Sequence, residues 1–535
     1  MHTVDSNRQN GRKAPRWQRI LRRPIRYGAA IGLLLAMLSG CTTSLRQWAD
    51  QGFKVGPDYH MPGAPFAPHW IDADAPEVND SANPENAWWT VFNDPVLDGL
   101  IATASAQNLG IQEAGARILE AEYRLALARG SLFPQTQQAF GSYSRTQRSG
   151  TSARPIRVRY FDTWATGLNA SWELDFWGRF RRGVEGSTAE FQAAVEDYRD
   201  ALVLLQAEVA TAYIQTRVAQ ERIALAKQNI ELQQDTRKLA EFRFEEGQTT
   251  RLDVTQAEQI LATTQALVPQ LEIALRESQN ALCVLLGVPP RDLNAELGIG
   301  PIPEPPPEAT VGIPSQLLRR RPDIRRAERR VAAQSARIGI AESDMYPRIA
   351  ITGTIGYETR DLPDLFRGNS LEGVVGPGFR WNILNYGRIL SDIRAEEARF
   401  EQLVLRYQDS VLKAHQEVEN GLHRFLREGE RARFLEAGVE AASESAELAR
   451  SQYEIGAVDF QRLLDSERAL VLLQDRRTAA RGQVAANLVA VYRALGGGWL
   501  PATPTGQAVE SIEPLEYGWP LEDELPLEAA PLPAP

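Results

Sequence analysis

Two long stretches of the chain contain no proline, and they limit the possible folds more than any other feature. They span residues 178–268 and 378–500 and are rich in Ala, Leu, Glu, Gln and Arg, which all have high helix propensity. The first stretch predicts one helix over residues 178–246, which at 1.5 Å per residue would be roughly 100 Å long. A compact globular domain cannot contain such a rod, so we expect a coiled coil or a tube of helices.

The two stretches are copies of one another. At an offset of 209 residues, identical residues coincide at many positions: Trp172 and Trp381, Gly178 and Gly387, Tyr198 and Tyr407, Glu208 and Glu417, Gly247 and Gly456, Glu258 and Glu467, Gly287 and Gly496. Upstream, at an offset of 213, Ile111 falls on Ile324 and Pro134 on Pro347. Such self-similarity indicates an internal duplication. Each half is predicted to contain a helix, two strands, a long helix, a turn and a second long helix.

The first long helix carries two apolar seams. Leu225, Leu232 and Leu239 recur every seven residues, and Ile223 and Ile230 recur two positions earlier. Two positions correspond to about 200° around a helix, so the seams lie on nearly opposite sides. A helix in a closed ring needs neighbours on both sides, which favours a tube. A plain antiparallel coiled coil remains the alternative.

Four segments alternate between apolar and polar residues: 135–147, 162–174, 348–359 and 371–383. The first of them is the weakest and is assigned mainly because its repeat partner is a strand. Strands of about ten residues with this alternation are typical of transmembrane β-structure, although a half-buried soluble sheet has the same pattern. Four strands cannot close a barrel, and an open edge cannot face lipid. A membrane-spanning sheet would therefore require several chains.

The N-terminus resembles a lipoprotein signal. A basic stretch, 12–26, precedes the apolar stretch 28–38 and the motif Leu38-Ser39-Gly40-Cys41. This order is typical of a secretory signal, and the apolar part is too short for a transmembrane helix. The motif resembles a lipobox, so Cys41 is the expected lipid attachment site and a firm membrane anchor; an ordinary thiol is the alternative. Thr42, in place of Asp, points to the outer membrane.

Composition argues against several classes of protein. The formal net charge of −10 does not fit a nucleic-acid-binding protein, which needs a clustered basic face. Besides Cys41 the only cysteine is Cys283, so the mature chain is expected to form no internal disulfide. No metal-ligand spacing, phosphate-binding loop or GxSxG motif occurs. We therefore expect no enzyme, no metal and no cofactor other than the lipid on Cys41.

Several motifs are spread over most of the chain: Val55-Gly56-Pro57-Asp58-Tyr59, Trp88-Trp89, Phe92-Asn93-Asp94-Pro95, Arg319-Arg320-Arg321-Pro322-Asp323 and Tyr346-Pro347. Together they resemble the TolC-like outer-membrane factor family, and more closely its lipidated NodT/OprM branch. The resemblance covers residues 55–499. It implies a homotrimer in which a twelve-stranded β-barrel in the outer membrane continues as an α-barrel of twelve helices in the periplasm.

The resemblance also implies a domain organisation and partners. The expected parts are a signal peptide (1–40), a lipidated N-terminal arm (41–96), a first repeat (97–287), an equatorial linker (288–314), a second repeat (315–499) and a disordered acidic Pro-rich tail (500–535). The expected partners are a periplasmic adaptor (membrane fusion protein), an inner-membrane transporter of the RND type and outer-membrane lipids, but no nucleic acid.

The candidate functional residues lie near the two helix–helix turns. Gly247 and Gln248 at one turn, and Gly456 and Ala457 at the other, are expected to contact the adaptor, although a simple solvated turn would have similar residues. Asp465 and Asp253 are the candidate carboxylates lining a periplasmic aperture, where copies of Asp465 around a threefold axis would favour cations. Exposed helical Asp is also common.

Gln461 and Arg462 depart from the family pattern at this aperture. Arg462 is expected to pair with a neighbouring carboxylate and to hold the gate closed, or else the gate is wired differently.

The sequence thus predicts a passive outer-membrane conduit that exports small molecules such as drugs and toxic compounds. The alternatives are the outer-membrane conduit of a type I protein secretion system and a structural coiled-coil lipoprotein that transports nothing.

Overall fold

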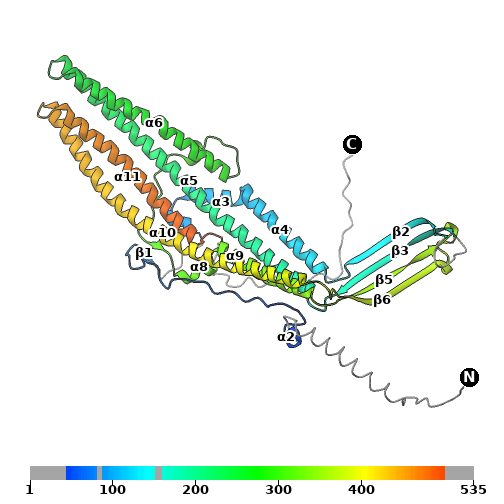
Figure 1. The fold of residues 1–535 in the computed structure, drawn as a ribbon. Helices are drawn as coiled ribbons and strands as arrows, with labels where there is room; N and C mark the ends of the chain where they lie inside the picture. The colour runs from blue at the N-terminus through cyan, green and yellow to red at the C-terminus, as the bar shows by residue number, and fades with distance from the viewer. Residues whose placement is uncertain (1–43, 81–86, 151–158, 500–535) are drawn as a thin grey trace, which may run out of the picture. The chain divides into compact units, whose positions relative to one another are not determined.

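The computed structural model describes residues 44–80, 87–150 and 159–499, and its elements follow one order twice (Figure 1). The predicted signal peptide, Cys41 and the predicted tail 500–535 lie outside the described residues. The first half comprises α3 (Pro95–Gln107), α4 (Leu109–Gly130), β2 (Thr136–Gln147), β3 (Tyr160–Leu174), α5 (Arg179–Glu245) and α6 (Arg251–Leu285). The second half comprises α8 (Leu317–Arg320), α9 (Pro322–Ser343), β5 (Arg348–Thr359), β6 (Leu371–Arg380), α10 (Arg388–Glu454) and α11 (Phe460–Ala494).

Three pairs of matching helices have equal lengths, which confirms the duplication. Helices α4 and α9 each have 22 residues, α5 and α10 each have 67, and α6 and α11 each have 35. Both 67-residue helices begin after a glycine with positive φ, 81° at Gly178 and 79° at Gly387. Glycine is the residue that adopts this conformation without a Cβ clash.

The four long strands form one antiparallel sheet in the order β2-β3-β5-β6. The predicted strand 371–383 is too long, because β6 ends at Arg380. The reason is that its partner β5 begins at Arg348, the residue paired with Arg380. Beyond this pair Trp381 has no strand partner, and its indole Nε1 donates to the carbonyl of Met345 instead (2.8 Å).

The register places most of the large apolar side chains of the four strands on one face, because directly paired residues share a face. Phe140, Phe161 and Val374 lie on the opposite face. The apolar face comprises Tyr143, Trp164, Leu168, Trp172, Leu174, Ile349, Ile351, Ile355, Tyr357, Leu371, Val375 and Phe379. The polar face comprises Thr146, Thr163, Asn169, Ser171, Glu173, Arg348, Thr352, Thr354, Glu358, Glu372 and Arg380. The alternation predicted strand by strand therefore combines into a two-sided sheet.

The long helices form two antiparallel hairpins, α5–α6 and α10–α11, whose turns lie at the end away from the sheet (Figure 1). Helix α5 also contacts α4, α9 and α11, so the fold is not a plain two-stranded coiled coil. Of the two apolar seams on α5, Ile223 is buried with Ala226 and Leu271. On the other seam Leu232 is exposed, whereas Leu239 packs against apolar residues near the turns.

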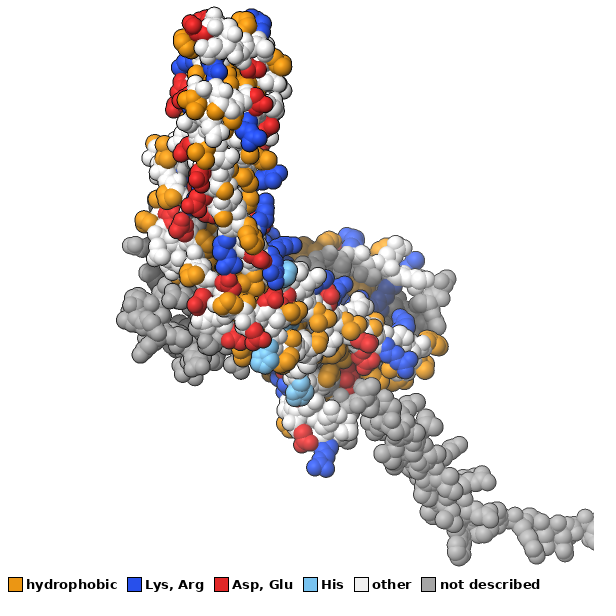
Figure 2. All heavy atoms as spheres, turned by 90° about the vertical axis from the view of Figure 1, so that its left-hand side faces the viewer, with side chains coloured by type: hydrophobic (Ala, Val, Ile, Leu, Met, Phe, Trp, Pro, Cys, Tyr) orange, Lys and Arg blue, Asp and Glu red, His pale blue; other side chains and the backbone are white. Residues whose placement is uncertain are grey.

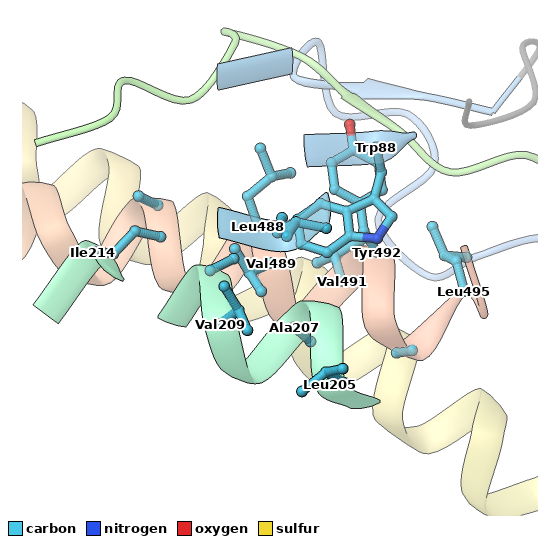
Figure 3. Packing of buried hydrophobic residues seen from close by; sticks show 14 of the residues in the cluster. Trp88, Leu205, Ala207, Val209, Ile214, Leu488, Val489, Val491, Tyr492 and Leu495 are labelled. Carbon is cyan, nitrogen blue, oxygen red and sulfur yellow. The ribbon is translucent and has the colours of Figure 1, made fainter. Parts of the chain in front are cut away.

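The main hydrophobic core lies where α3, α5, α10 and α11 meet. Figure 3 shows Trp88 over Tyr492 of α11, with Leu205 and Val209 of α5 nearby. The two rings are stacked at 5.7 Å between centroids. Trp88 belongs to a short 3-10 helix, η2 (Trp88–Phe92). The buried thiol of Cys283 in α6 lies in the same core.

Short elements lie in the N-terminal arm, in the linker between the repeats and in the β5–β6 loop. They are α2 (Leu45–Asp50), β1 (Val78–Asn79), α7 (Asn294–Leu297), β4 (Ala309–Thr310), η3 (Pro314–Gln316), η4 (Leu362–Asp364) and η5 (Gly368–Ser370). Strands β1 and β4 pair in parallel and so join the N-terminal arm to the linker between the repeats. Among the described residues, no helix combines the length and the apolar character needed to cross a membrane.

Candidate gate at the helical tips

The two hairpin turns have the same backbone conformation. Gly247 and Gly456 have φ values of 73° and 76°, in the left-handed region that favours glycine. In each turn, two N–H groups donate back into the helix that has just ended: those of Gly247 and Gln248 at 3.0 and 2.8 Å, and those of Gly456 and Ala457 at 2.9 and 2.8 Å. This is a common way to satisfy the last carbonyls of a helix. All four residues are exposed, so the turns are accessible to a partner.

An apolar cluster beneath the turns holds the two hairpins together. This tip cluster takes residues from α5, α6, α10 and α11: Ala240, Val254, Ala257, Ile260, Ala449, Tyr453, Phe460, Leu463 and Leu464. Because it contains side chains from both hairpins, the two turns cannot separate without exposing it.

Arg243 of α5 clasps Tyr453 of α10 within this region. Its guanidinium lies 4.5 Å from the centre of the Tyr453 ring and donates to the Tyr453 carbonyl. The ring also packs against Phe460, 5.2 Å away, and burial raises the pKa of the Tyr453 hydroxyl. Sequence reasoning missed this pair. Its signal was the departure from the repeat, since Gln452 and Phe244 occupy the matching positions.

Asp253 is half-buried in the first turn. Its carboxylate accepts hydrogen bonds from the hydroxyls of Thr249 and Thr250, the latter at 3.4 Å. A carboxylate in the first turn of α6 is also favoured by the helix dipole. These contacts give Asp253 a structural role within the turn.

Asp465 on α11 is exposed and has a different environment. It accepts a hydrogen bond from Gln461 (3.0 Å) and lies 3.5 Å from the guanidinium of Arg468. The backbone N–H of Arg462 donates to the N-cap residue Asp459 (3.1 Å); within the described ranges its side chain makes no ion pair. Inside one chain the basic partner of Asp465 is therefore Arg468, which its (i, i+3) spacing could have indicated.

Farther from the turns, polar side chains join α5 to α11. We call this row of contacts the hairpin seam. It consists of Arg222 with Asp475 (2.7 and 3.0 Å), Asn229 with Gln474 (2.9 Å), and Thr236 with Glu467 (2.6 Å). Burial raises the pKa of the Glu467 carboxyl. Within the part of the chain that the structure describes, no three His, Cys, Asp or Glu residues are placed to hold a metal ion.

The family model "outer membrane efflux protein" matches residues 100–288 and 313–497, that is, both repeats. The chain belongs to the outer membrane efflux protein family. It is 31% identical to nodulation protein T of Rhizobium leguminosarum bv. trifolii over 461 residues, which cover 85% of this chain and 96% of the relative. It is 30% identical to the pyoverdine export outer membrane protein OpmQ of Pseudomonas putida, covering 79% of this chain and 90% of that one.

Solved structures of efflux channels have the same fold. The chain is similar to the outer-membrane channel OprN with a TM-score of 0.78 and 34% identity, covering 83% of this chain and 99% of OprN. It is similar to CusC with a TM-score of 0.72 and 26% identity, covering 83% of this chain and all of CusC. The predicted family and the mainly helical, duplicated fold are thereby confirmed, and the helical tips belong to an outer-membrane efflux protein.

Proposed function

We propose that this efflux protein is one protomer of a homotrimeric channel, and that the channel is a passive conduit for small molecules. The observation that carries the proposal is the sheet. It has one apolar face and one polar face, and β2 and β6 are its edges. Unpaired edges are not tolerated in lipid, so the sheet must close with the sheets of other copies.

The dimensions of the apolar face fit the outer membrane. Trp164 and Trp172 on β3 lie near its two ends, and Tyr143 packs on Trp164 with 4.4 Å between ring centroids. Eight residues of antiparallel strand span about 27 Å. At a strand tilt of about 40° this length corresponds to a height of about 21 Å, comparable to the apolar band of about 25 Å between the aromatic girdles of outer-membrane barrels.

The difference between matching helices of the two repeats supports a particular packing of neighbouring copies. Ala332 and Ala336 of α9 are buried, at 9% and 4% exposure, in the region where α9 contacts α5. The matching residues of α4 are Leu119 and Tyr123, which are 53% and 69% exposed. Large exposed apolar side chains at these positions favour burial of α4 against a second copy.

The long helices α5 and α10 show the same contrast between a buried residue and its exposed counterpart. Val203 of α5 is buried, whereas its repeat counterpart Leu412 of α10 is 53% exposed. If α4 of the next copy packs on α10 as α9 packs on α5, both exposed positions become buried. A contact of this head-to-tail kind generates a closed ring when the rotation closes. Figure 2 shows further apolar side chains exposed among charged ones on the side of the molecule facing the viewer.

We further propose that the ring works in a tripartite efflux system. The exposed turns at Gly247, Gln248, Gly456 and Ala457 would receive a periplasmic adaptor, and an inner-membrane transporter of the RND type would supply the energy. Cys41 would carry the lipid anchor. Adaptor binding would loosen the Arg243–Tyr453 clasp and the contacts around Asp465, Arg462 and Asp253, and the tips would then open. The conduit itself performs no bond chemistry.

In-cell photo-crosslinking from position 457 or 248, followed by mass spectrometry, tests this function. We expect capture of the adaptor of a proton-driven drug pump. Capture of a secretion adaptor would instead support the type I protein secretion alternative. If neither position captured a periplasmic partner in a correctly inserted channel, the tripartite mechanism would be wrong.

A further inference from the structure

The two loops at the far end of the sheet differ in charge. The loop between β2 and β3, residues 148–159, contains four arginines and no acidic residue. The loop between β5 and β6, residues 360–370, contains two arginines and two aspartates. The duplication therefore produced one strongly basic loop and one balanced loop at the same end of the sheet.

Two arginines, one from each loop, lie against the same aromatic ring. The guanidinium carbons of Arg148 and Arg360 are 5.1 and 5.6 Å from the centroid of Phe161, within the range of cation–π attraction. Phe161 pairs with Thr146 on the polar face of the sheet. The Phe161 ring thus holds two cationic groups from distant parts of the chain at the rim of the polar face.

The nearby carboxylates do not neutralise this pair. Asp162 alternates to the apolar face, where it is 3.8 Å from Arg145 and accepts a hydrogen bond from Tyr143 (3.1 Å). Asp364 is paired with Arg367 at 2.8 Å. Asp361 directly follows Arg360 in the sequence, but no ion pair joins the two in the described part of the chain. Arg148 and Arg360 likewise make no ion pair within the described ranges.

Carboxylates of the polar face lie farther from the loops. Glu358 of β5 is two residues before Arg360 in the chain, and Glu372 pairs with Gly356, two residues farther along β5 on the same face. Each step of two residues along a strand is about 7 Å. The polar face therefore carries two arginines, Arg148 and Arg360, at its outer end and two carboxylates, Glu358 and Glu372, at successive levels below them.

We propose that Arg148 and Arg360 determine the charge preference of the exit and favour anionic solutes that carry carboxylate or phosphate groups. The inference rests on the proposed channel, in which the polar face lines the lumen and this end opens to the exterior. Repeated around the ring, the arginines form a cationic rim, and charged rings of this kind select ions. Guanidinium groups also match carboxylate and phosphate geometry.

The test is ion selectivity of the full-length channel in planar bilayers, measured as the reversal potential across a KCl gradient. The variant Arg148→Gln/Arg360→Gln should raise the K⁺-to-Cl⁻ permeability ratio about twofold. The matched variant Arg145→Gln/Arg367→Gln removes the same charge from groups that already have carboxylate partners, and should leave the ratio unchanged. Glu358→Gln/Glu372→Gln should shift the ratio toward Cl⁻.

A wild-type ratio in the Arg148→Gln/Arg360→Gln channel would overturn the inference, provided that its conductance shows a properly formed pore. An equal shift in the matched variant would also overturn it, because the effect would then be one of net charge alone. An unchanged permeability ratio in the Glu358→Gln/Glu372→Gln channel would also overturn the inference, because the charges of this face would then not act on permeating ions. A wild-type protein that never conducts would contradict the proposed channel function itself.

Discussion

Helices α4 and α9 occupy the same place in the two repeats, and only one of them is buried. Each has 22 residues, but α9 contacts both long helices, α5 and α10, whereas α4 contacts α5 and not α10 to any comparable extent. The buried helix presents small residues such as Ala332 and Ala336, and the exposed helix presents Leu119 and Tyr123. In the proposed ring, the exposed face of α4 would make with the next copy the contact that α9 makes within the chain.

The largest effect is expected where this comparison predicts contact between copies. The double variant Leu119→Glu/Tyr123→Glu would place two carboxylates in a buried apolar interface, which costs several kcal/mol when no partner is available. We expect loss of the oligomer on native gels and in sedimentation. As a control, Arg124→Lys should leave assembly intact, because it keeps the charge at a position whose repeat counterpart, Arg337, is exposed and ion-paired with Glu190 of α5. Normal assembly of the double variant would show that α4 is not at the interface.

A substitution in the buried helix α9 should have a smaller effect, which concerns the stability of the single chain. Ala333 of α9 is almost fully buried, so Ala333→Leu should lower the stability by about 1–3 kcal/mol through overpacking. The measurement is the midpoint of thermal unfolding in detergent. Arg337→Leu on the exposed side of the same helix should change stability by less than about 0.5 kcal/mol. Equal effects of the two changes would mean that the packing of α9 does not distinguish these faces.

One substitution makes the first tip more similar to the second. Arg243→Gln gives the first tip the amide that Gln452 supplies in the second, and removes the clasp on Tyr453. A cation–π contact is worth about 1 kcal/mol, so the ratio of open to closed tips should rise about fivefold. Conductance of reconstituted channels measures this ratio. Arg243→Lys retains a cation over the ring and should keep the conductance near the wild-type value. An unaltered conductance in Arg243→Gln would mean that the contact between Arg243 and Tyr453 does not hold the tip closed.

The smallest effect concerns pH at the hairpin seam. Burial raises the pKa of the Glu467 carboxyl, so the folded state favours its protonated form. The stability that this provides is fully present below the ordinary Glu pKa and is lost as pH rises through the raised value. Glu467→Gln should therefore be more stable than wild type at pH 7, by less than about 1 kcal/mol, and the difference should vanish below pH of about 4.

Denaturant unfolding of wild type and variant across this pH range gives the comparison. Glu258→Gln, the same change at the exposed counterpart in α6, should have no such pH-dependent effect. A constant difference between Glu467→Gln and wild type at all pH values would exclude titration of Glu467 as the cause.

Most of the fold could be predicted from the sequence because it depends on periodicity. The proline-free stretches predict α5 and α10, and the alternation of residues such as Trp164 and Leu168 predicts the sheet faces. The end of β6 could not be predicted in this way, because it is set by the start of β5. Gly247 and Gly456 locate the two helix–helix turns directly.

The contacts of the candidate gate were harder to predict. The Arg243–Tyr453 clasp and the hairpin seam join residues more than 200 positions apart, and no spacing rule connects them. The sequence shows only that the repeats differ there. The pairing of Asp465 with Arg468 lies within one helix, so the spacing of the two residues could have predicted it. The departure of Arg462 from the family pattern favoured that residue instead.

The most direct test of the account is disulfide formation at two equivalent pairs of positions. An ideal Cβ at Gly186 is 3.5 Å from that of Ala336, a separation suited to a disulfide, so Gly186→Cys/Ala336→Cys should form a bond within one chain. The equivalent pair across copies is Ala395 on α10 and Tyr123 on α4. We predict that Tyr123→Cys/Ala395→Cys gives covalent trimers on non-reducing gels. Chains that remain monomeric, while the first pair oxidises normally, would contradict the claim that the interface within the chain recurs between chains.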